Sequence, residues 1–296
     1  EVPEGTEYYL PAGSSYRVTP FALMKGFRLA GSRDGVKPIV VLEGSWSIAE
    51  GSYLSSLEFD NIEFRHEANN NYFMNTSKAY TIENVSFVNC DFISLRRGFW
   101  RHQSANAKYI MNLEMEGCRF EGCGWQTSAY GAFNLQSFDK DNGVSYDQVD
   151  RAIFRNCTFS NDNDGTNGYG WGNLFYAPYM DKPIDLEYKN VTIYNYSRNQ
   201  RLINIESAVG SKLVMEGILL ASPCGDLFAI GANTTTTFSN NYTTADYTLG
   251  GKNMNATDLK ITAAELFADP ANGDLTIKDT SSPIVSNRAG DTRWLP

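Results

Sequence analysis

Apolar residues recur at every second position on both sides of a repeated glycine or asparagine. Residues two and four positions before each of these anchors, and one and three positions after it, are apolar, while the residue immediately before it is charged. A period of two predicts β-strands, and glycine and asparagine tolerate left-handed backbone better than other residues. Each anchor therefore predicts a tight turn between two short strands. The anchors are Gly26, Asn61, Asn84, Gly117, Asn156, Asn190 and Gly217.

A third apolar segment follows most of these strand pairs, as at 39–41, 131–135, 173–175, 201–205 and 226–230. Three strands per repeat, with apolar side chains stacked from one repeat to the next, predict an all-β solenoid. The fold that we expect is a single right-handed parallel β-helix of about seven or more coils with capped ends. One domain spans 1–296, with an N-terminal cap region at 1–21, coils at 22–231 and a C-terminal capping module at 232–296.

The alignment of the anchors predicts a ladder of turns. Asn61, Asn84, Asn156 and Asn190 should stack with left-handed or bridging backbone, because asparagine and glycine alternate at these positions and share that tolerance. A β-branched residue in the place of one of them should destabilise the fold.

The cysteines fit the interior of the coils better than a metal site. Cys118 and Cys157 fall on consecutive rungs of one apolar column, and Cys90 should lie just past the second turn of its coil. The chain has five cysteines and no zinc-binding pair of pairs among them. We therefore expect buried free thiols, which behave as small apolar groups, rather than disulfides.

The balance of charges narrows the class of partner. Twenty-five basic and 34 acidic side chains give a net charge of −9, and such a field repels polyanions, so nucleic-acid binding is not expected. No apolar run approaches the roughly 18 to 20 residues that a membrane-spanning helix needs, so no transmembrane segment is expected. The chain begins at Glu1, which suits a processed protein, and we expect a monomer.

Both ends of the chain resemble those of known β-helix proteins. The segments 8–16, 24–31 and 37–40 resemble the opening of pectin-lyase-like β-helix proteins, in which a capping segment precedes the first full coil. The segments 265–277 and 290–295 are similar to the closing module of β-helix proteins of unassigned function from gut Bacteroidetes, encoded among genes for polysaccharide use. The resemblance implies the fold, a polysaccharide partner, and a secreted, periplasmic or outer-membrane surface location. It implies no activity.

The one basic cluster of the sequence is a candidate carbohydrate site. It spans 96–103 and contains Arg97, Trp100 and Arg101. Guanidinium groups suit bidentate contact with carboxylate or sulfate, and tryptophan stacks on sugar rings or on arginine. Because neighbouring strand residues face opposite sides, only one of Trp100 and Arg101 can point at a ligand. The alternative interpretation is an arginine ladder paired with acidic neighbours.

Arg201 extends this candidate site along the solenoid. It precedes the third strand three coils later, which places it about 14 Å along the axis when coils stack at the usual strand spacing. That distance corresponds to about three sugar units, so an acidic polysaccharide could contact both groups.

Aromatic residues of the long insertions are further candidate sugar platforms, with loop packing as the alternative for each: Trp125, Tyr169, Trp171, Tyr176 and Tyr179. The insertion at 161–172 resembles a calcium loop in composition, but Trp171 occupies the position that needs a bidentate glutamate. A flexible loop is the favoured interpretation, with Ca²⁺ as its alternative. No metal-ligand set is assigned, and no other cofactor is expected.

Three functions are compatible with these patterns. The favoured one is a secreted or cell-surface carbohydrate-recognition protein that binds a polysaccharide, acidic if the arginines contact it, along one face of the β-helix. The first alternative is a polysaccharide lyase that cleaves uronate-containing glycans by β-elimination. The usual signatures of β-helix lyases and hydrolases are absent, however, and His66 and His102 lack the flanking pattern of a catalytic base. A structural, adhesin-like β-helix is the second alternative.

Overall fold

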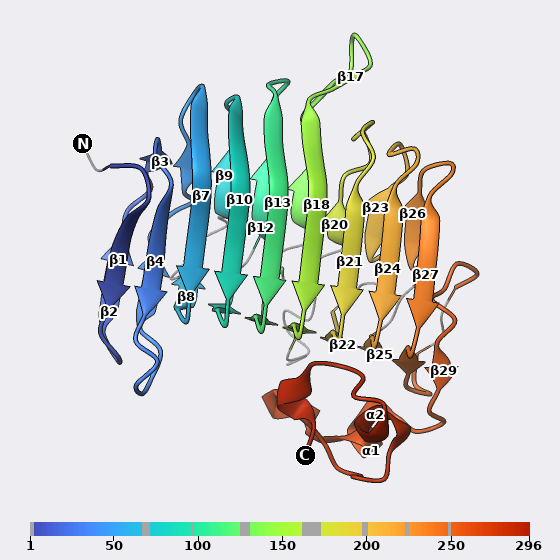
Figure 1. Ribbon diagram of the computed structural model, residues 1–296. Helices are drawn as coiled ribbons and strands as arrows, with labels where there is room; N and C mark the ends of the chain where they lie inside the picture. The colour runs from blue at the N-terminus through green and yellow to red at the C-terminus, as the bar shows by residue number, and fades with distance from the viewer. Residues whose placement is uncertain are drawn as a thin grey trace.

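The computed structural model describes residues 3–66, 72–95, 97–124, 131–161, 173–196, 201–222, 225–247 and 250–296. The chain forms the expected right-handed parallel β-helix, with three long parallel sheets that run along its axis (Figure 1). Consecutive strands of a coil lie in different sheets, so each strand pairs with strands of the neighbouring coils. No helix within these residues is both long and apolar enough to cross a membrane.

The first and second sheets are the longest. Within the described residues the first sheet has nine strands: β1 (Thr6–Leu10), β4 (Phe27–Gly31), β7 (Ser52–Asp60), β10 (Tyr80–Val88), β13 (Lys108–Glu116), β18 (Asp147–Arg155), β21 (Asp185–Lys189), β24 (Lys212–Glu216) and β27 (Thr235–Ser239). The second sheet has ten there: β2 (Ser15–Val18), β5 (Ile39–Leu42), β8 (Glu63–His66), β11 (Asp91–Ile93), β14 (Arg119–Glu121), β19 (Thr158–Ser160), β22 (Thr192–Tyr194), β25 (Leu219–Ala221), β28 (Tyr242–Thr243) and β29 (Thr257–Asp258).

The third sheet and several short elements complete the described structure. The strands of the third sheet are β9 (Tyr72–Thr76), β12 (Gly98–His102), β15 (Gly131–Leu135), β20 (Asn173–Tyr176), β23 (Ile203–Ile205) and β26 (Phe228–Ile230). Short strand pairs are β3 (Ala22–Leu23) with β6 (Ser47–Ile48), β16 (Phe138–Asp139) with β17 (Val144–Ser145), and β30 (Phe267–Asp269) with β31 (Asp274–Ile277). The short helices are α1 (Ala263–Leu266), η1 (Pro270–Asn272), α2 (Pro283–Ser286) and η2 (Thr292–Trp294).

A ladder of left-handed turns joins the first sheet to the second. The predicted turns at Asn61, Gly117, Asn156, Asn190 and Gly217 are confirmed, because all five have φ between 48° and 67°. Left-handed backbone at these positions bends the chain sharply within one residue. Apolar residues two positions before and one position after the turn, such as Phe59 and Ile62, are therefore both buried.

The predicted turn at Asn84 is wrong, and the turn of that coil is at Asn89, where φ is 51°. Asn84 lies exposed in the middle of β10 and pairs with Asn112 of β13. The strand changes which alternate side chains face inward at this point, since Ile82 and Val85 are both buried although they are three positions apart, an odd number. A phase change inside a long strand gives the same sequence pattern as a turn.

The anchor at Gly26 is misplaced by the same five residues. Phe27 pairs with Leu57 and Ala30 pairs with Asp60, so Gly31 is the residue in register with Asn61. Gly26 precedes β4 instead of following it.

The interior contains ladders of like side chains. Phe64, Phe92, Phe120 and Phe159 stack ring on ring along the second sheet, with centroids 4.7 to 5.5 Å apart. The predicted stack of buried, reduced cysteines is also confirmed, and Cys90 belongs to it. The register places Cys90, Cys118 and Cys157 on consecutive rungs, and all three are free thiols with 0% exposure.

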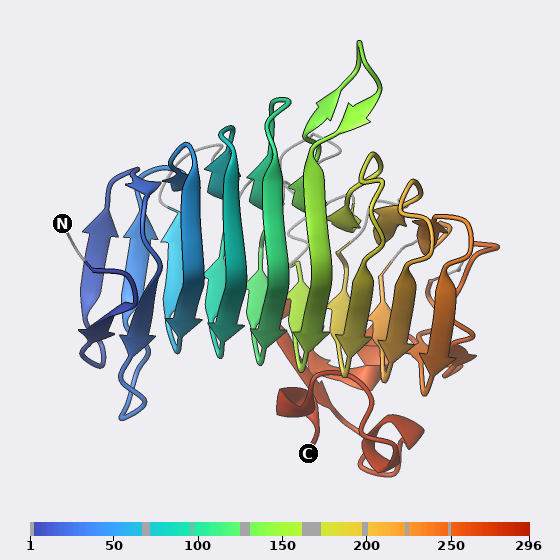
Figure 2. The ribbon, with the colours of Figure 1, turned by 45° about the horizontal axis from the view of Figure 1, so that its top comes forward.

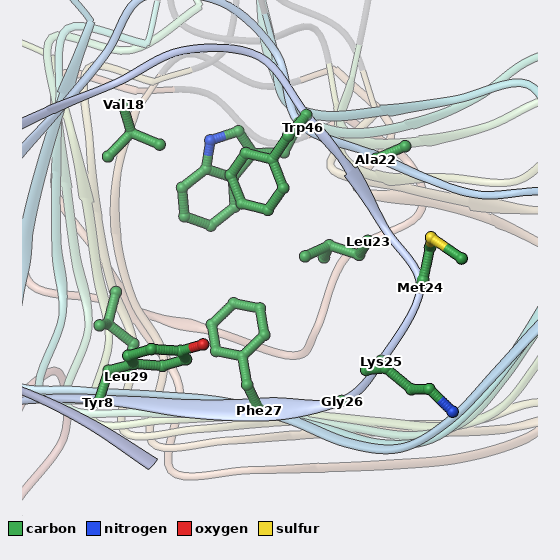
Figure 3. Close-up of a pocket in the computed structure, with 11 residues that line it drawn as sticks. Tyr8, Val18, Ala22, Leu23, Met24, Lys25, Gly26, Phe27, Leu29 and Trp46 are labelled. Atoms are coloured by element: carbon green, nitrogen blue, oxygen red, sulfur yellow. The ribbon is translucent and has the colours of Figure 1, made fainter. Parts of the chain in front are cut away.

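The N-terminal end of the described solenoid has an apolar hollow. The expected cap region at 1–21 contains β1 and β2, which are already strands of the first and second sheets. A hollow of about 550 Å³ lies at this end, and Tyr8, Phe27 and Trp46 project into it (Figure 3). Phe21 and Met24 also line it and are 40% and 63% exposed. The first coil thus leaves apolar side chains exposed at this end, whereas Trp46 is 2% exposed.

The C-terminal module lies against the side of the solenoid. Strands β27, β28 and β29 continue the sheets, and the chain from Ala263 folds back along the outer face of the second sheet (Figures 1 and 2). There Leu219 packs in one cluster with Leu266 and Phe267. Trp294 Nε1 donates a hydrogen bond to Thr158 Oγ1 at 2.7 Å. The region expected as a capping module therefore contains three further strands of the solenoid, followed by a segment that packs against the second sheet.

Candidate functional site

The described part of the basic cluster, 97–103, lies around β12, the second strand of the third sheet, and its tryptophan is inside. Trp100 has 0% exposure, pairs with Met74 and Phe133 on the neighbouring strands, and donates a hydrogen bond from Nε1 to the hydroxyl of Tyr80 at 3.3 Å. A fully buried indole cannot stack on a sugar. Trp100 is therefore wrong as a ligand contact, and it is part of the core.

Arg101 faces outward, as strand alternation requires once Trp100 points inward. Its guanidinium carbon lies 5.4 Å from the centroid of the Tyr72 ring, within the range of a cation–π interaction. The Tyr72 ring lies over Gly98, where an added Cβ would be 2.6 Å from the ring. Gly98 thus makes room for the ring that supports Arg101. Arg97 is partly exposed in the turn just before β12.

A column of polar residues runs along the outer face of the third sheet. Strand pairing puts five of them in register on consecutive strands: Asn75, Arg101, Asn134, Tyr176 and Asn204. The Oδ1 atoms of Asn75 and Asn134 are buried and have no hydrogen-bond partner among the described residues. Asn134 and Asn204 are 1% and 5% exposed, so Asn75, Arg101 and Tyr176, which are partly exposed, are the residues of the column that a ligand can reach. The sequence signal is one residue with a polar group after two apolar ones at β9, β12, β15, β20 and β23, whereas β26 has Ala229 at this position.

An aromatic platform adjoins this column, and two residues predicted from the insertions, Tyr176 and Tyr179, meet there. The rings of Tyr179 and Phe138 stack, with centroids 4.3 Å apart and planes at 14°. Tyr176 and Tyr179 are both partly exposed. Burial raises the pKa of Tyr176, as do Tyr179 and Glu206, while Arg201 opposes the shift. We call Phe138 and Tyr179 the aromatic platform.

Arg201 is exposed and precedes β23, which is the third strand after β12 in this sheet. Three strand spacings amount to about 14 Å. Arg101 and Arg201 therefore lie at the two ends of the stretch that contains Asn134 and Tyr176.

The remaining predicted residues cannot be placed. Tyr169, Trp171 and Trp125 lie outside the described residues, as does the insertion at 162–172 that resembles a calcium loop. Within the described part of the chain, no group of three or more His, Cys, Asp or Glu side chains could hold a metal ion.

Sequence reasoning missed the partners of the predicted residues. No motif surrounds Tyr72, Asn75, Asn134 or Phe138 in the sequence. Strand pairing brings the first three close to Arg101, and ring stacking brings Phe138 to Tyr179. Comparison with family models, with curated proteins and with solved structures finds no match to the chain.

Proposed function

We propose that this protein recognises a polysaccharide, which binds along the outer face of the third sheet. The observation that carries the proposal is the register of the polar column, in which amide, guanidinium and phenol groups follow one another on consecutive strands beside an aromatic platform. A linear ligand with regularly spaced hydroxyl groups is complementary to such a row.

The spacing and chemistry of the row favour a glycan chain over a compact ligand. Consecutive strands are about 4.8 Å apart, so the donors and acceptors repeat along the axis rather than converge on one point. The amide of Asn75, which is partly exposed, can both donate to and accept from sugar hydroxyls. The rings of Tyr179 and Tyr176 offer flat apolar surface with a polar tip, which suits the apolar face of a sugar.

Arg101 and Arg201 favour an acidic glycan. Guanidinium groups bind carboxylates and sulfates with two parallel hydrogen bonds. The chain carries a net charge of −9, which repels anionic ligands at long range. The two arginines add positive charge at this face, where an acidic glycan would bind. Uronate or sulfate groups about three sugar units apart would match their separation. Such a ligand places the protein in a secreted, periplasmic or outer-membrane setting.

A glycan array that includes neutral, uronate and sulfated polymers tests the proposal. The wild type should bind an acidic polymer, and Tyr179→Ala should weaken that binding about tenfold, the loss of roughly one good contact. Tyr53→Ala is the matched control, because Tyr53 is an exposed tyrosine on the first sheet.

Two results would argue against recognition at this face. Absence of binding to every polymer would leave the structural, adhesin-like role. Ultraviolet absorbance from an unsaturated uronate product, measured on the same samples, would instead support a lyase.

A further inference from the structure

A buried chain of hydrogen bonds lies where the third sheet turns into the first. His102, at the end of β12, has 0% exposure. Its Nδ1 is 2.6 Å from Oδ1 of Asp147, and its Nε2 is 2.5 Å from the hydroxyl of Tyr80. Asp147 and Tyr80 are 3% and 4% exposed, so these three side chains form a polar group that is almost closed to solvent.

The chemistry of the partners determines which nitrogen of His102 carries the proton. The carboxylate of Asp147 can only accept, so Nδ1 donates to it. Nε2 then accepts from the hydroxyl of Tyr80, which itself accepts from Nε1 of Trp100. A neutral imidazole protonated on Nδ1 satisfies every group in this chain.

The other groups around the imidazole agree with this arrangement. Thr76 of β9 and Leu135 of β15 are its uncharged neighbours in the third sheet. Lys108 of β13 lies between Tyr80 and Asp147 in the first sheet. Its Nζ donates to the carbonyl oxygens of Ser104 and Asn106, at 3.2 and 2.7 Å. Burial lowers the pKa of His102, although Asp147 opposes this shift.

The second oxygen of Asp147 holds the base of a projecting hairpin. Oδ2 accepts a hydrogen bond from the backbone N–H of Ser137 at 2.5 Å, and Tyr146 N donates to the carbonyl of Ser137 at 2.8 Å. Ser137 immediately precedes β16, which pairs with β17 to form a hairpin that projects beyond the start of β18 (Figures 1 and 2). The next residue is Phe138, whose ring stacks on Tyr179.

We infer that Asp147 is a positioning residue: its two carboxylate oxygens connect His102 to the hairpin base and so hold Phe138 against Tyr179 in the aromatic platform. This role in glycan recognition rests on the proposed function, whereas the role in placing the platform does not. A buried carboxylate that binds a side chain with one oxygen and a loop backbone with the other leaves the hairpin base little freedom to shift.

The tautomer of His102 can be measured directly by NMR, because the chain has only two histidines and their ring signals are easily assigned. ¹⁵N NMR of the wild type at neutral pH should show a protonated Nδ1 and an unprotonated Nε2 at His102. Asp147→Asn has one acceptor oxygen for two donors, so either the proton of His102 moves to Nε2 or the N–H of Ser137 loses its acceptor. Asp150→Asn is the matched control on the same strand, since Asp150 is exposed.

Limited trypsin digestion reports on the hairpin without any ligand. Lys140 is exposed beside its tip. Asp147→Ala removes both acceptors and should speed cleavage after Lys140 about tenfold, as expected for one unsatisfied buried donor. Asp150→Ala should leave the rate unchanged, and Asp147→Asn should lie between the two. Equal rates in Asp147→Ala and Asp150→Ala would overturn the inference, and so would a wild-type His102 protonated on Nε2, which needs no variant to fold.

A double-mutant cycle connects the hairpin to recognition. With polygalacturonate as the probe, Asp147→Ala and Phe138→Ala should each weaken binding. The double variant should be no weaker than Phe138→Ala alone, because both act through the same ring. Full additivity would show that Asp147 does not act through Phe138. If the wild type itself fails to bind, the proposed function fails for this polymer, while cleavage and NMR still decide the role of Asp147.

Discussion

The side-chain amide of Asn89 donates a hydrogen bond to Oδ1 of Asn61, 2.6 Å away on the preceding coil. Both residues have left-handed backbone, with φ of 51° and 56°. The pair links two consecutive turns between the first and second sheets. The side chain therefore joins the coils at the point where the backbone least tolerates substitution.

Replacement of Asn89 by valine should lower the free energy of unfolding by about 2 kcal/mol, because a β-branched residue is forced into left-handed backbone. Urea unfolding measures the difference. Asn84→Val is the control, since Asn84 is exposed in mid-strand and valine favours strands, so a change within about 0.5 kcal/mol is expected. Equal losses in the two variants would contradict the placement of the turn at Asn89.

The same pair shows how far the sequence determines the fold. Alternating apolar positions and the Gly or Asn anchors predict the solenoid, its turns at Asn61 and Asn156, and the cysteine stack. They do not separate a turn from a phase change within a strand, so Asn84 was an equally good anchor on pattern alone. The decision comes from pairing, in which Val88 of β10 aligns with Asp60 and Glu116.

The candidate site is less accessible to sequence reasoning, because it depends on contacts between coils. Tyr179 and Arg201 could be named from residue type, but Phe138 lies forty-one residues before Tyr179 and carries no motif. The prediction of Trp100 as a ligand contact is wrong because the sequence shows that Trp100 and Arg101 face opposite sides without showing which side is inward. Register with Met74 and Phe133 settles that point.

Gly290 holds the C-terminal module against the second sheet. Its φ is 80°, and an added Cβ would lie 2.8 Å from Thr192 Oγ1. Gly290→Ala should therefore cost about 3 kcal/mol of unfolding free energy, from backbone strain and overpacking together. Gly273→Ala separates the two effects, because Gly273 has φ of 82° but its nearest atom is Glu121 Oε1 at 3.9 Å. Similar losses in urea unfolding for both variants would show that the contact with Thr192 is unimportant.

Acid should weaken the fold through His102. Burial lowers the pKa of this side chain below the ordinary value of 6.5, and Asp147 only partly opposes the shift. Below about pH 6.5 the unfolded chain binds a proton there that the folded chain binds only at lower pH, so the unfolding free energy falls as the pH drops through this window. Above it this contribution is constant. NMR titration should give His102 a pKa below 6.5, and a value at or above 6.5 would reverse the predicted slope.

Removal of the two arginines of the polar face should weaken binding of an acidic polymer. Arg101→Ala/Arg201→Ala eliminates both guanidinium groups and should reduce the affinity for polygalacturonate by about a hundredfold or more, as charge-assisted hydrogen bonds contribute roughly 1.5 to 3 kcal/mol each when well formed. Isothermal titration of the wild type should also show affinity falling as salt rises, since exposed charges are screened over about 8 Å at physiological ionic strength.

The control for this variant removes the same charge elsewhere. Arg17 and Arg151 are exposed on β2 and β18, outside the third sheet, so Arg17→Ala/Arg151→Ala changes the net charge equally without touching the polar column. If the net charge of the protein governed binding, both double variants would lose affinity equally, because each removes two positive charges. If the face between Arg101 and Arg201 binds the glycan, only the first loses affinity and its salt dependence becomes shallower, because fewer ion pairs remain to be screened. Unchanged affinity in the first variant would remove both arginines from the site and leave the aromatic platform of Phe138 and Tyr179 as its remaining candidate.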